Sequence, residues 1–487
     1  MPDSAASLWA PVERAAAAQQ PAPRASFRWV IGALPALVLL TVAALAVFLP
    51  EGLATNARLA LFAFAAAAIL WTLTRLNAAY VSLGAVLFLS LSGAIEQEDL
   101  FEALESDVIW LMIGAFVLGA AVHQTGLADR LTRIAAAGDR TVGRVIWLLT
   151  LLLLPLAFLI PSTSGRAAVS LPVFRSLSDA AGSRQVTRAL ALLIPTVILV
   201  STISSLVGAG SHLIANDLLD EVADQRIGFG EWALYGLPFG ATASLVSAYV
   251  ISRMFLSAET RATRLRLPPP AASRFSAAEW RTCVVVLAMV GLWLTERQHG
   301  LEIATVSIAG AFLLTLPALG VIKWKTGLDS VGWNLILFVG TALVLGEALI
   351  ETGAARWLIE QAFAATHIRE AGSPLLILLA LALISLTSHL YLASHAARAA
   401  ALIPPLLYLA GALNLDAVAV MFLANVGLNY CLTFPVSSKA LLMYQEADGE
   451  TWLPADLLRL SAVLLPVHAL LMAIFYFGYW QHIGLAL

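Results

Sequence analysis

Long apolar segments follow one another along almost the whole chain, separated by short polar stretches. An apolar segment of about 17–25 residues is long enough to cross a bilayer as an α-helix. The pattern predicts about eleven spanning helices. They cover residues 29–49, 57–74, 78–93, 107–124, 186–219, 231–256, 280–297, 302–320, 331–351, 415–446 and 457–484.

Two further segments, 145–181 and 374–413, do not fit a simple span. Each consists of an apolar run, a polar break and a second apolar run. The first break lies at the start of the sequence "PSTSGRAAVSLP" (161–172), and the second lies at the start of "ASHAARAAALIP" (393–404). Irregular backbone at membrane depth persists only where protein or a water-filled cavity satisfies its polar groups. We therefore predict two re-entrant hairpins whose tips are the polar breaks.

Composition agrees with a membrane-embedded chain. Apolar residues make up 60% and charged residues 12%, which is roughly half the charged fraction of a soluble domain. The net charge of −3 gives no reason to expect a nucleic-acid partner. Cys283 and Cys431 lie in apolar segments and form no metal or disulfide motif. The fold class predicted is an all-α polytopic membrane protein in contact with membrane lipid.

The distribution of arginine predicts the orientation. Arginines cluster in the 125–144 loop and the 257–281 linker, whereas the 94–107 loop has no Lys or Arg. Because basic loops stay cytoplasmic, the N-terminus is expected inside and the C-terminus in the periplasm. Residues 1–28 are interpreted as a disordered cytoplasmic tail. They lack signal-peptide features, which favours a multi-pass protein of a bacterial inner membrane.

The chain contains an internal repeat. "IGAFVLGAAVHQTGLADRL" (113–131) resembles "VGTALVLGEALIETGAARWL" (339–358), and both hairpins share Ser-x-x-x-Arg-Ala-Ala followed by proline. After a first helix and loop (29–56), we place one repeat at 57–256 and the other at 282–487, joined by a cytoplasmic linker at 257–281. Each repeat holds an odd number of spans, so the copies are inverted. Inverted repeats with broken helices are typical of secondary transporters, whose substrate site lies between the repeats.

The hairpin tips carry candidate chemistry for an anion. A helix beginning near Ser162 directs free N–H groups and the positive end of its dipole into the cavity. The arm ending near Ile160 presents carbonyls, which suit Na⁺. Placing Arg166 and Arg398 in a bilayer costs free energy, and arginines at such positions usually face a cavity or a partner. They are interpreted as anion ligands, as structural partners of Glu347, or as fixed charges that replace a bound Na⁺.

These motifs resemble the divalent anion/sodium symporter family, which transports di- and tricarboxylates or sulfate. "WLMIGAFVLGAAVHQTGLADR" (110–130) is similar to its fourth span, and residues 161–166 resemble the Pro-Ser-Asn-Thr-Ala-Arg tip of its carboxylate-exchanger branch. The second tip matches only at Ser394. The family breaks a helix after each hairpin, typically at Gly-Thr-Pro-Pro-Asn. Here "LVGAGSHLIA" (206–215) and "FPVSSKALLM" (434–443) take those places, with His212 and Lys439 at the asparagine positions.

The resemblance implies secondary active transport of small divalent or trivalent anions, with Na⁺ as the co-transported ion, no organic cofactor, an elevator movement and a homodimer. Together with the tip chemistry it defines two sets of site residues. Substrate binding is assigned to Ser162, Thr163, Ser164, Arg166, Ser211, His212, Ser394, His395, Arg398, Ser438 and Lys439. Sodium binding is assigned to Ser162, Ser164, Gly165, Gly208, Ser394 and Pro435.

Other interpretations stay open. Sodium-independent exchange or sulfate transport would use the same tips. If Lys439 does not bind the anion, it pairs with an acid or extends its ammonium group to the membrane surface. If His212 and His395 do not belong to the substrate or ion site, they are ordinary hydrogen-bonding side chains. Asn425 and Asn429 either line the cavity or bond between helices. Cation/proton antiport would need acids at the breaks, where serine, histidine and lysine stand instead. A membrane enzyme is disfavoured because the histidines are scattered and no nucleophile motif occurs. A channel would differ only in lacking coupled counterflow.

Overall fold

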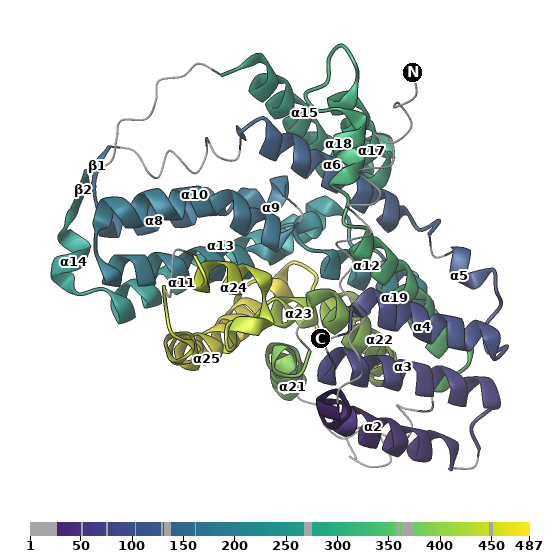
Figure 1. The fold of residues 1–487 in the computed structure, drawn as a ribbon. Coiled ribbons are helices and arrows are strands. Elements are labelled where there is room, and N and C mark those ends of the chain that lie inside the picture. The colour runs from purple at the N-terminus through teal and green to yellow at the C-terminus, as the bar shows by residue number, and fades with distance from the viewer. Residues whose placement is uncertain are drawn as a thin grey trace, which may run out of the picture.

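The computed structural model confirms an architecture that is almost entirely helical (Figure 1). It describes residues 27–49, 52–74, 76–102, 104–127, 130, 138–160, 162–266, 275–355, 357, 361, 374–392, 394–447 and 451–487. Nearly all of the predicted 1–28 tail lies outside these residues. Nine described helices are long and apolar enough to cross a membrane, and shorter apolar helices accompany them.

The helices fall into two groups, which we call the scaffold and the hairpin bundle. The scaffold contains α2 (Phe27–Phe48), α3 (Thr55–Leu73), α4 (Ala78–Leu91), α5 (Asp99–Glu102), α6 (Asp107–Gln124), α15 (Ala277–Leu294), α16 (Glu296–His299), α17 (Ile303–Thr315), α18 (Trp324–Asp329) and α19 (Trp333–Glu351). Its largest contacts cross between the repeats, because α6 packs on α17 and α4 packs on α19.

The hairpin bundle contains the two segments that are predicted to be hairpins and the helices that follow them. From the first repeat come α8 (Val142–Leu153), α9 (Leu156–Leu159), α10 (Thr163–Ala181), α11 (Arg184–Val200), α12 (Gly210–Ala223) and α13 (Phe229–Phe255). From the second come α21 (Pro374–Thr387), α22 (His395–Leu413), α23 (Ala417–Leu428), α24 (Lys439–Gln445) and α25 (Pro454–Gly478). The first hairpin therefore begins at Val142, three residues before its predicted start.

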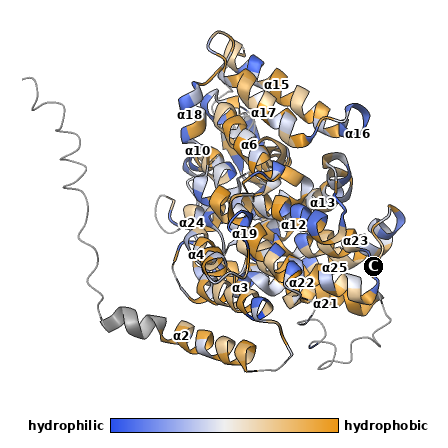
Figure 2. Ribbon diagram, turned by 90° about the vertical axis from the view of Figure 1, so that its right-hand side faces the viewer, coloured by the Kyte–Doolittle hydropathy of each residue, from blue (hydrophilic) through white to orange (hydrophobic). Residues whose placement is uncertain are grey.

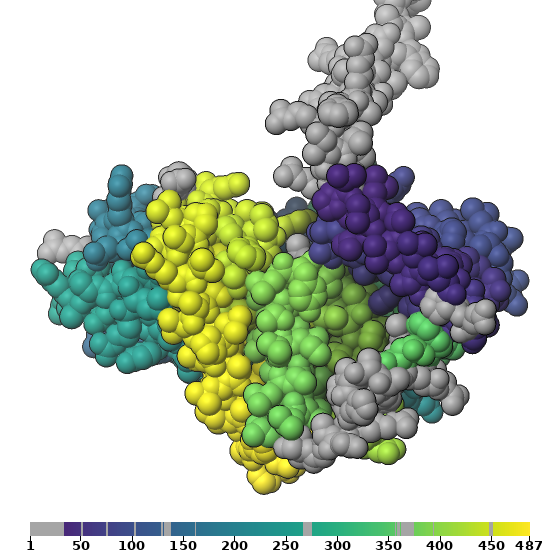
Figure 3. Space-filling model, turned by 90° about the horizontal axis from the view of Figure 1, so that it is seen from below, coloured from purple at the N-terminus to yellow at the C-terminus, as the bar shows by residue number. Residues whose placement is uncertain are grey.

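Each repeat packs its hairpin against the broken helix of the other. α22 lies against α12, and α10 lies against α24. The Tyr444 hydroxyl of α24 donates to the Ala167 carbonyl of α10 at 3.0 Å, and its ring meets Phe174 edge-on at 5.3 Å. This reciprocal packing closes the bundle around its centre. Seen from below, the C-terminal helix and the second hairpin lie side by side (Figure 3).

Both breaks are formed by short 3₁₀ turns: η1 (Thr202–Ser204) and η2 (Leu206–Gly208) in the first repeat, and η5 (Pro435–Ser437) in the second. A Cβ atom on Gly208 would lie 2.4 Å from the Thr202 carbonyl oxygen, so this tight turn requires glycine. Pro435 opens η5, and as proline it has no N–H for a helix to use. Gly208 and Pro435 thus lie within the breaks that separate α11 from α12 and α23 from α24.

The linker forms a small sheet that the sequence analysis did not predict. β1 (Asp139–Thr141) pairs antiparallel with β2 (Arg264–Arg266), and α14 (Ala258–Ala262) precedes β2. This ribbon attaches the linker to the start of the first hairpin. The outer helices α2, α3 and α15 are mostly apolar along their length (Figure 2), and large side chains such as Leu34 and Leu287 are exposed on them, as expected for lipid contact.

Helix α13 approaches the first break so closely that it requires glycine there. A Cβ atom on Gly236 would lie 2.0 Å from the Ile203 carbonyl oxygen, whereas one on Gly291 in α15 would meet nothing within 4 Å. We expect Gly236→Ala to destabilise the protein by about 1–3 kcal/mol because backbone must shift. Gly291→Ala should be neutral or stabilising by up to ~1 kcal/mol. Thermal unfolding in detergent, followed by tryptophan fluorescence, measures both; equal melting temperatures would contradict the packing.

Candidate functional site

The two hairpin tips are capped by the serines of the repeated motif. Ser162 Oγ accepts a hydrogen bond from the Gly165 N–H at 3.1 Å, and Ser394 Oγ accepts one from the Ala397 N–H at 3.3 Å. Ser162 is half-buried and Ser394 is exposed. Each serine therefore starts the second arm of its hairpin as an N-cap, which directs the positive end of α10 or α22 toward the tip.

Arg166, one turn inside the first tip, is fully buried. Its Nη2 donates to the Thr202 hydroxyl at 3.0 Å and to the Gly208 carbonyl at 2.9 Å. Its Nε and Nη1 have no hydrogen-bond partner. The guanidinium thus fastens the hairpin to the first break and still offers donors that protein does not fill.

Arg398 repeats this arrangement in the second hairpin. It is fully buried, its Nη1 donates to the Tyr430 carbonyl at 3.1 Å, and its Nε and Nη2 have no partner. Among the described contacts, neither Arg166 nor Arg398 forms an ion pair. Glu347, the structural partner considered from sequence, is exposed on α19.

Side chains also satisfy other carbonyls of the first break. Trp232 Nε1 donates to Ile203 O at 2.9 Å, and His212 Nδ1 lies 3.0 Å from Ser205 O. Because a carbonyl only accepts, His212 carries its proton on Nδ1. Its Nε2 then accepts from Asn429 Nδ2 at 2.8 Å, which joins the breaks of the two repeats directly.

His395 is half-buried at the second tip and faces the same centre. Its Nε2 lies 3.3 Å from Cys431 Sγ, and its Nδ1 has no partner. Cys431 directly follows Tyr430, whose carbonyl accepts from Arg398, so His395 lies in the same part of the second break as Arg398. The structure thus brings together the two arginines and two histidines that the sequence proposed from separate repeats.

The remaining candidates occupy different environments. Thr163, Ser164 and Gly165 are half-buried in the first turn of α10. Ser211 is buried with its hydroxyl unpartnered, and Ser438 caps α24 by accepting from the Ala440 N–H at 3.2 Å. Lys439, by contrast, is exposed. Its side chain lies outside the buried centre, although its backbone begins the helix after the break.

Several residues at this centre did not enter the predicted site. Thr202 and Cys431 occupy the same position, eight residues before the helix that follows each break, and each lies beside its repeat's arginine. Aligning the two breaks from their following helices would have found them. A second network joins His389 Nε2 to Thr433 Oγ1 and Thr433 Oγ1 to Ser461 Oγ, both at 2.7 Å.

In each unit a helix that follows a polar tip packs against the interrupted helix of the other unit, and interrupted helices of this kind are typical of secondary transporters. The family model for the sodium:sulfate symporter transmembrane region matches residues 29–486, so the chain belongs to that family of membrane transporters and is not an enzyme. This membership confirms the family resemblance seen in the sequence.

Known relatives agree. A membrane protein of Cupriavidus necator is 26% identical, with 95% of this chain and 94% of that protein covered. The citrate/succinate antiporter of Escherichia coli K12 is 23% identical over 70% of this chain and 72% of its own length. The YdaH transporter of Alcanivorax borkumensis has the same fold at a TM-score of 0.55 and 15% identity, covering 81% and 89% of the two chains.

The contrast between Arg398 and Lys439 gives a test of the site. We expect Arg398→Gln to weaken binding of a small anionic substrate about tenfold or more, because a charged donor to the anion is lost. Lys439→Gln should leave affinity within about twofold, since that ammonium is exposed. Ligand-dependent thermal stabilisation measures both. Equal losses in the two variants would place Lys439 in the site after all.

Proposed function

We propose that the chain is a secondary active transporter that exchanges small di- or tricarboxylates across a bacterial inner membrane. One observation carries the proposal: each repeat buries an arginine that has unfilled N–H donors and no described ion-pair partner. A buried cation without a counter-ion is strongly disfavoured. A bound dianion with a carboxylate for each guanidinium would supply both counter-charges and fill the free donors through charge-assisted hydrogen bonds.

The contacts of Arg166 favour exchange over sodium-coupled symport. Gly208, whose carbonyl was assigned to Na⁺, accepts instead from the Arg166 guanidinium at 2.9 Å. A fixed cation at this carbonyl performs the electrostatic role of a bound Na⁺ but does not dissociate. An empty carrier would then keep two uncompensated buried charges, so its return across the membrane would be slow unless another anion binds.

The similarity to a citrate/succinate antiporter supports the same conclusion. Elevator movement of the hairpin bundle against the scaffold, a homodimer, and a cytoplasmic N-terminus with a periplasmic C-terminus belong to this proposal. Sodium-coupled symport, including sulfate symport, is the second candidate, because the family is described by sodium and sulfate. Cation/proton antiport is weaker, since no acid stands in the described breaks 201–209 and 429–438.

Exchange in proteoliposomes tests the proposal. We expect labelled succinate uptake without Na⁺ to rise at least about tenfold when the vesicles are preloaded with succinate or citrate, and an inward Na⁺ gradient to change it less than about twofold. Uptake that needs Na⁺ and ignores preloading would instead establish the symporter.

A pair of arginine variants on one helix serves as the matched control. Arg166→Gln should abolish preloading-dependent uptake because the hairpin loses its fixed charge. Arg175→Gln, at an exposed position of the same helix α10, should retain uptake near the wild-type rate. If Arg166→Gln exchanges normally, the buried charge is not required and the mechanism is wrong.

A further inference from the structure

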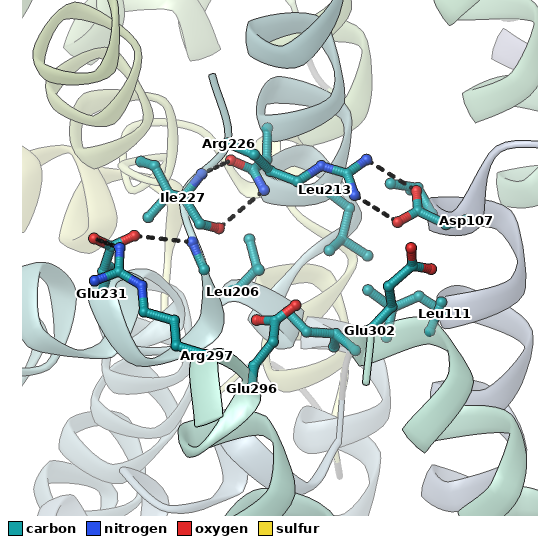
Figure 4. Close-up of a pocket in the computed structure, with 15 residues that line it drawn as sticks. Asp107, Leu111, Leu206, Leu213, Arg226, Ile227, Glu231, Glu296, Arg297 and Glu302 are labelled. Carbon is teal, nitrogen blue, oxygen red and sulfur yellow. Dashed lines mark hydrogen bonds and ion pairs between the residues drawn. The ribbon is translucent and has the colours of Figure 1, made fainter. Parts of the chain in front are cut away.

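A cavity of about 280 Å³ lies at the junction of the scaffold and the hairpin bundle (Figure 4). Its walls come from the start of α6, the α12–α13 connection and the α15–α17 connection. Along the chain, the C-terminal end of α6 is followed by β1, the C-terminal end of α13 is followed by β2, and the N-terminal end of α15 follows β2. The opposite ends of these three helices border the cavity, which therefore lies on the face opposite the β1–β2 ribbon. The cavity also reaches Leu206 within the first break and Leu213 in α12.

Arg226 connects the two units across this cavity. It lies on the α12–α13 connection of the bundle and donates to both carboxylate oxygens of Asp107 in the scaffold, at 2.6 and 3.0 Å (Figure 4). Arg226 also pairs with Asp217 at 3.2 Å and Asp220 at 3.4 Å, both on its own side of the junction.

A second pair crosses at the neighbouring edge. Arg297 in α16 of the scaffold pairs with Glu231 in the first turn of α13. The adjacent Glu296 lies beside the start of the same helix, because a Cβ atom on Gly228 would lie 3.5 Å from Glu296 Oε2. The scaffold therefore holds the N-terminus of α13 through the Arg297–Glu231 ion pair.

We propose that Arg226–Asp107 and Arg297–Glu231 form an ionic latch that holds the hairpin bundle against the scaffold in this conformation and opens in each transport cycle. The inference rests on the elevator movement in the proposed function. None of the other described ion pairs joins the two units: Arg188–Asp456 lies in the bundle, Arg130–Glu279 links the segment after α6 to α15, and Arg264–Asp139 joins the two strands of the ribbon.

The exposure and partners of Arg226 suit a latch that opens. The side chains of Arg226 and Asp107 are 39% and 30% exposed, so water replaces each partner when they separate. Arg226 keeps Asp217 and Asp220 after it leaves Asp107, so no buried charge is left alone. The Arg226–Asp107 ion pair thus has a specific geometry, yet breaking it costs little free energy.

Cross-linking tests the latch directly. In the double variant Asp107→Cys/Arg226→Cys, we expect a short bifunctional methanethiosulfonate to reduce exchange at least about tenfold, and a reductant to restore it. The single variants, treated identically, control for Cys283 and Cys431 and should keep their exchange rates. Full exchange by the completely cross-linked protein would overturn the latch.

A distance measurement needs no transport and separates the two proposals. Spin labels on the exposed positions Gln225→Cys and Gln298→Cys report the separation of bundle and scaffold. Asp107→Asn with Arg297→Gln should raise the population at a second distance about threefold or more. Glu302→Gln, which lines the same cavity, should leave the distribution unchanged. An unchanged distribution in the double variant would falsify the latch. Absence of carboxylate exchange in the wild type, with the distances shifting as expected, would refute only the proposed function.

Discussion

The structure depends on how the polar backbone of two broken helices is satisfied inside an apolar bundle. Chain breaks at membrane depth are stable only where protein or water fills their hydrogen bonds. Here Trp232, His212 and Arg166 each donate to a carbonyl of the first break, and Arg398 donates to one of the second. These contacts fix the breaks and determine where the hairpins, α13 and the opposite repeat can lie.

The same contacts explain why the centre suits an anion. A guanidinium has five N–H donors in a planar fork, and one carbonyl or hydroxyl cannot use them all. Arg166 and Arg398 therefore reach the breaks with donors left over, and the inverted repeat places one such group in each half. His395 adds a further ring nitrogen without a partner. Structural anchoring and anion attraction are thus two consequences of the same side chains.

Much of this organisation could be predicted from sequence. Apolar length located the unbroken helices within a few residues, and the repeated Ser-x-x-x-Arg motif located the starts of α10 and α22. The environment of Lys439 was harder to predict from sequence. Its place after the break resembles that of His212, yet its side chain is exposed. The contacts of Arg166 lie 36 and 42 residues away in sequence, and Arg226 and Asp107 are 119 apart. No local period encodes such pairings, nor the three-residue strands of the linker.

The buried arginines at the centre and the ion pairs of the latch differ in strength, and so they have different roles. A half-exposed ion pair contributes about 0–1 kcal/mol, since water solvates both partners when they part. An unpaired charge in a buried bundle costs several kcal/mol even after relaxation. The latch between Arg226 and Asp107 can therefore bias the resting position of the bundle, but it cannot prevent an empty carrier from moving. In the proposed exchange mechanism Arg166 and Arg398 do prevent it, because their charges would move with the bundle and a bound anion would be needed to neutralise them. Under that mechanism the centre determines how strictly transport depends on a bound anion, and the latch determines only the resting position of the bundle.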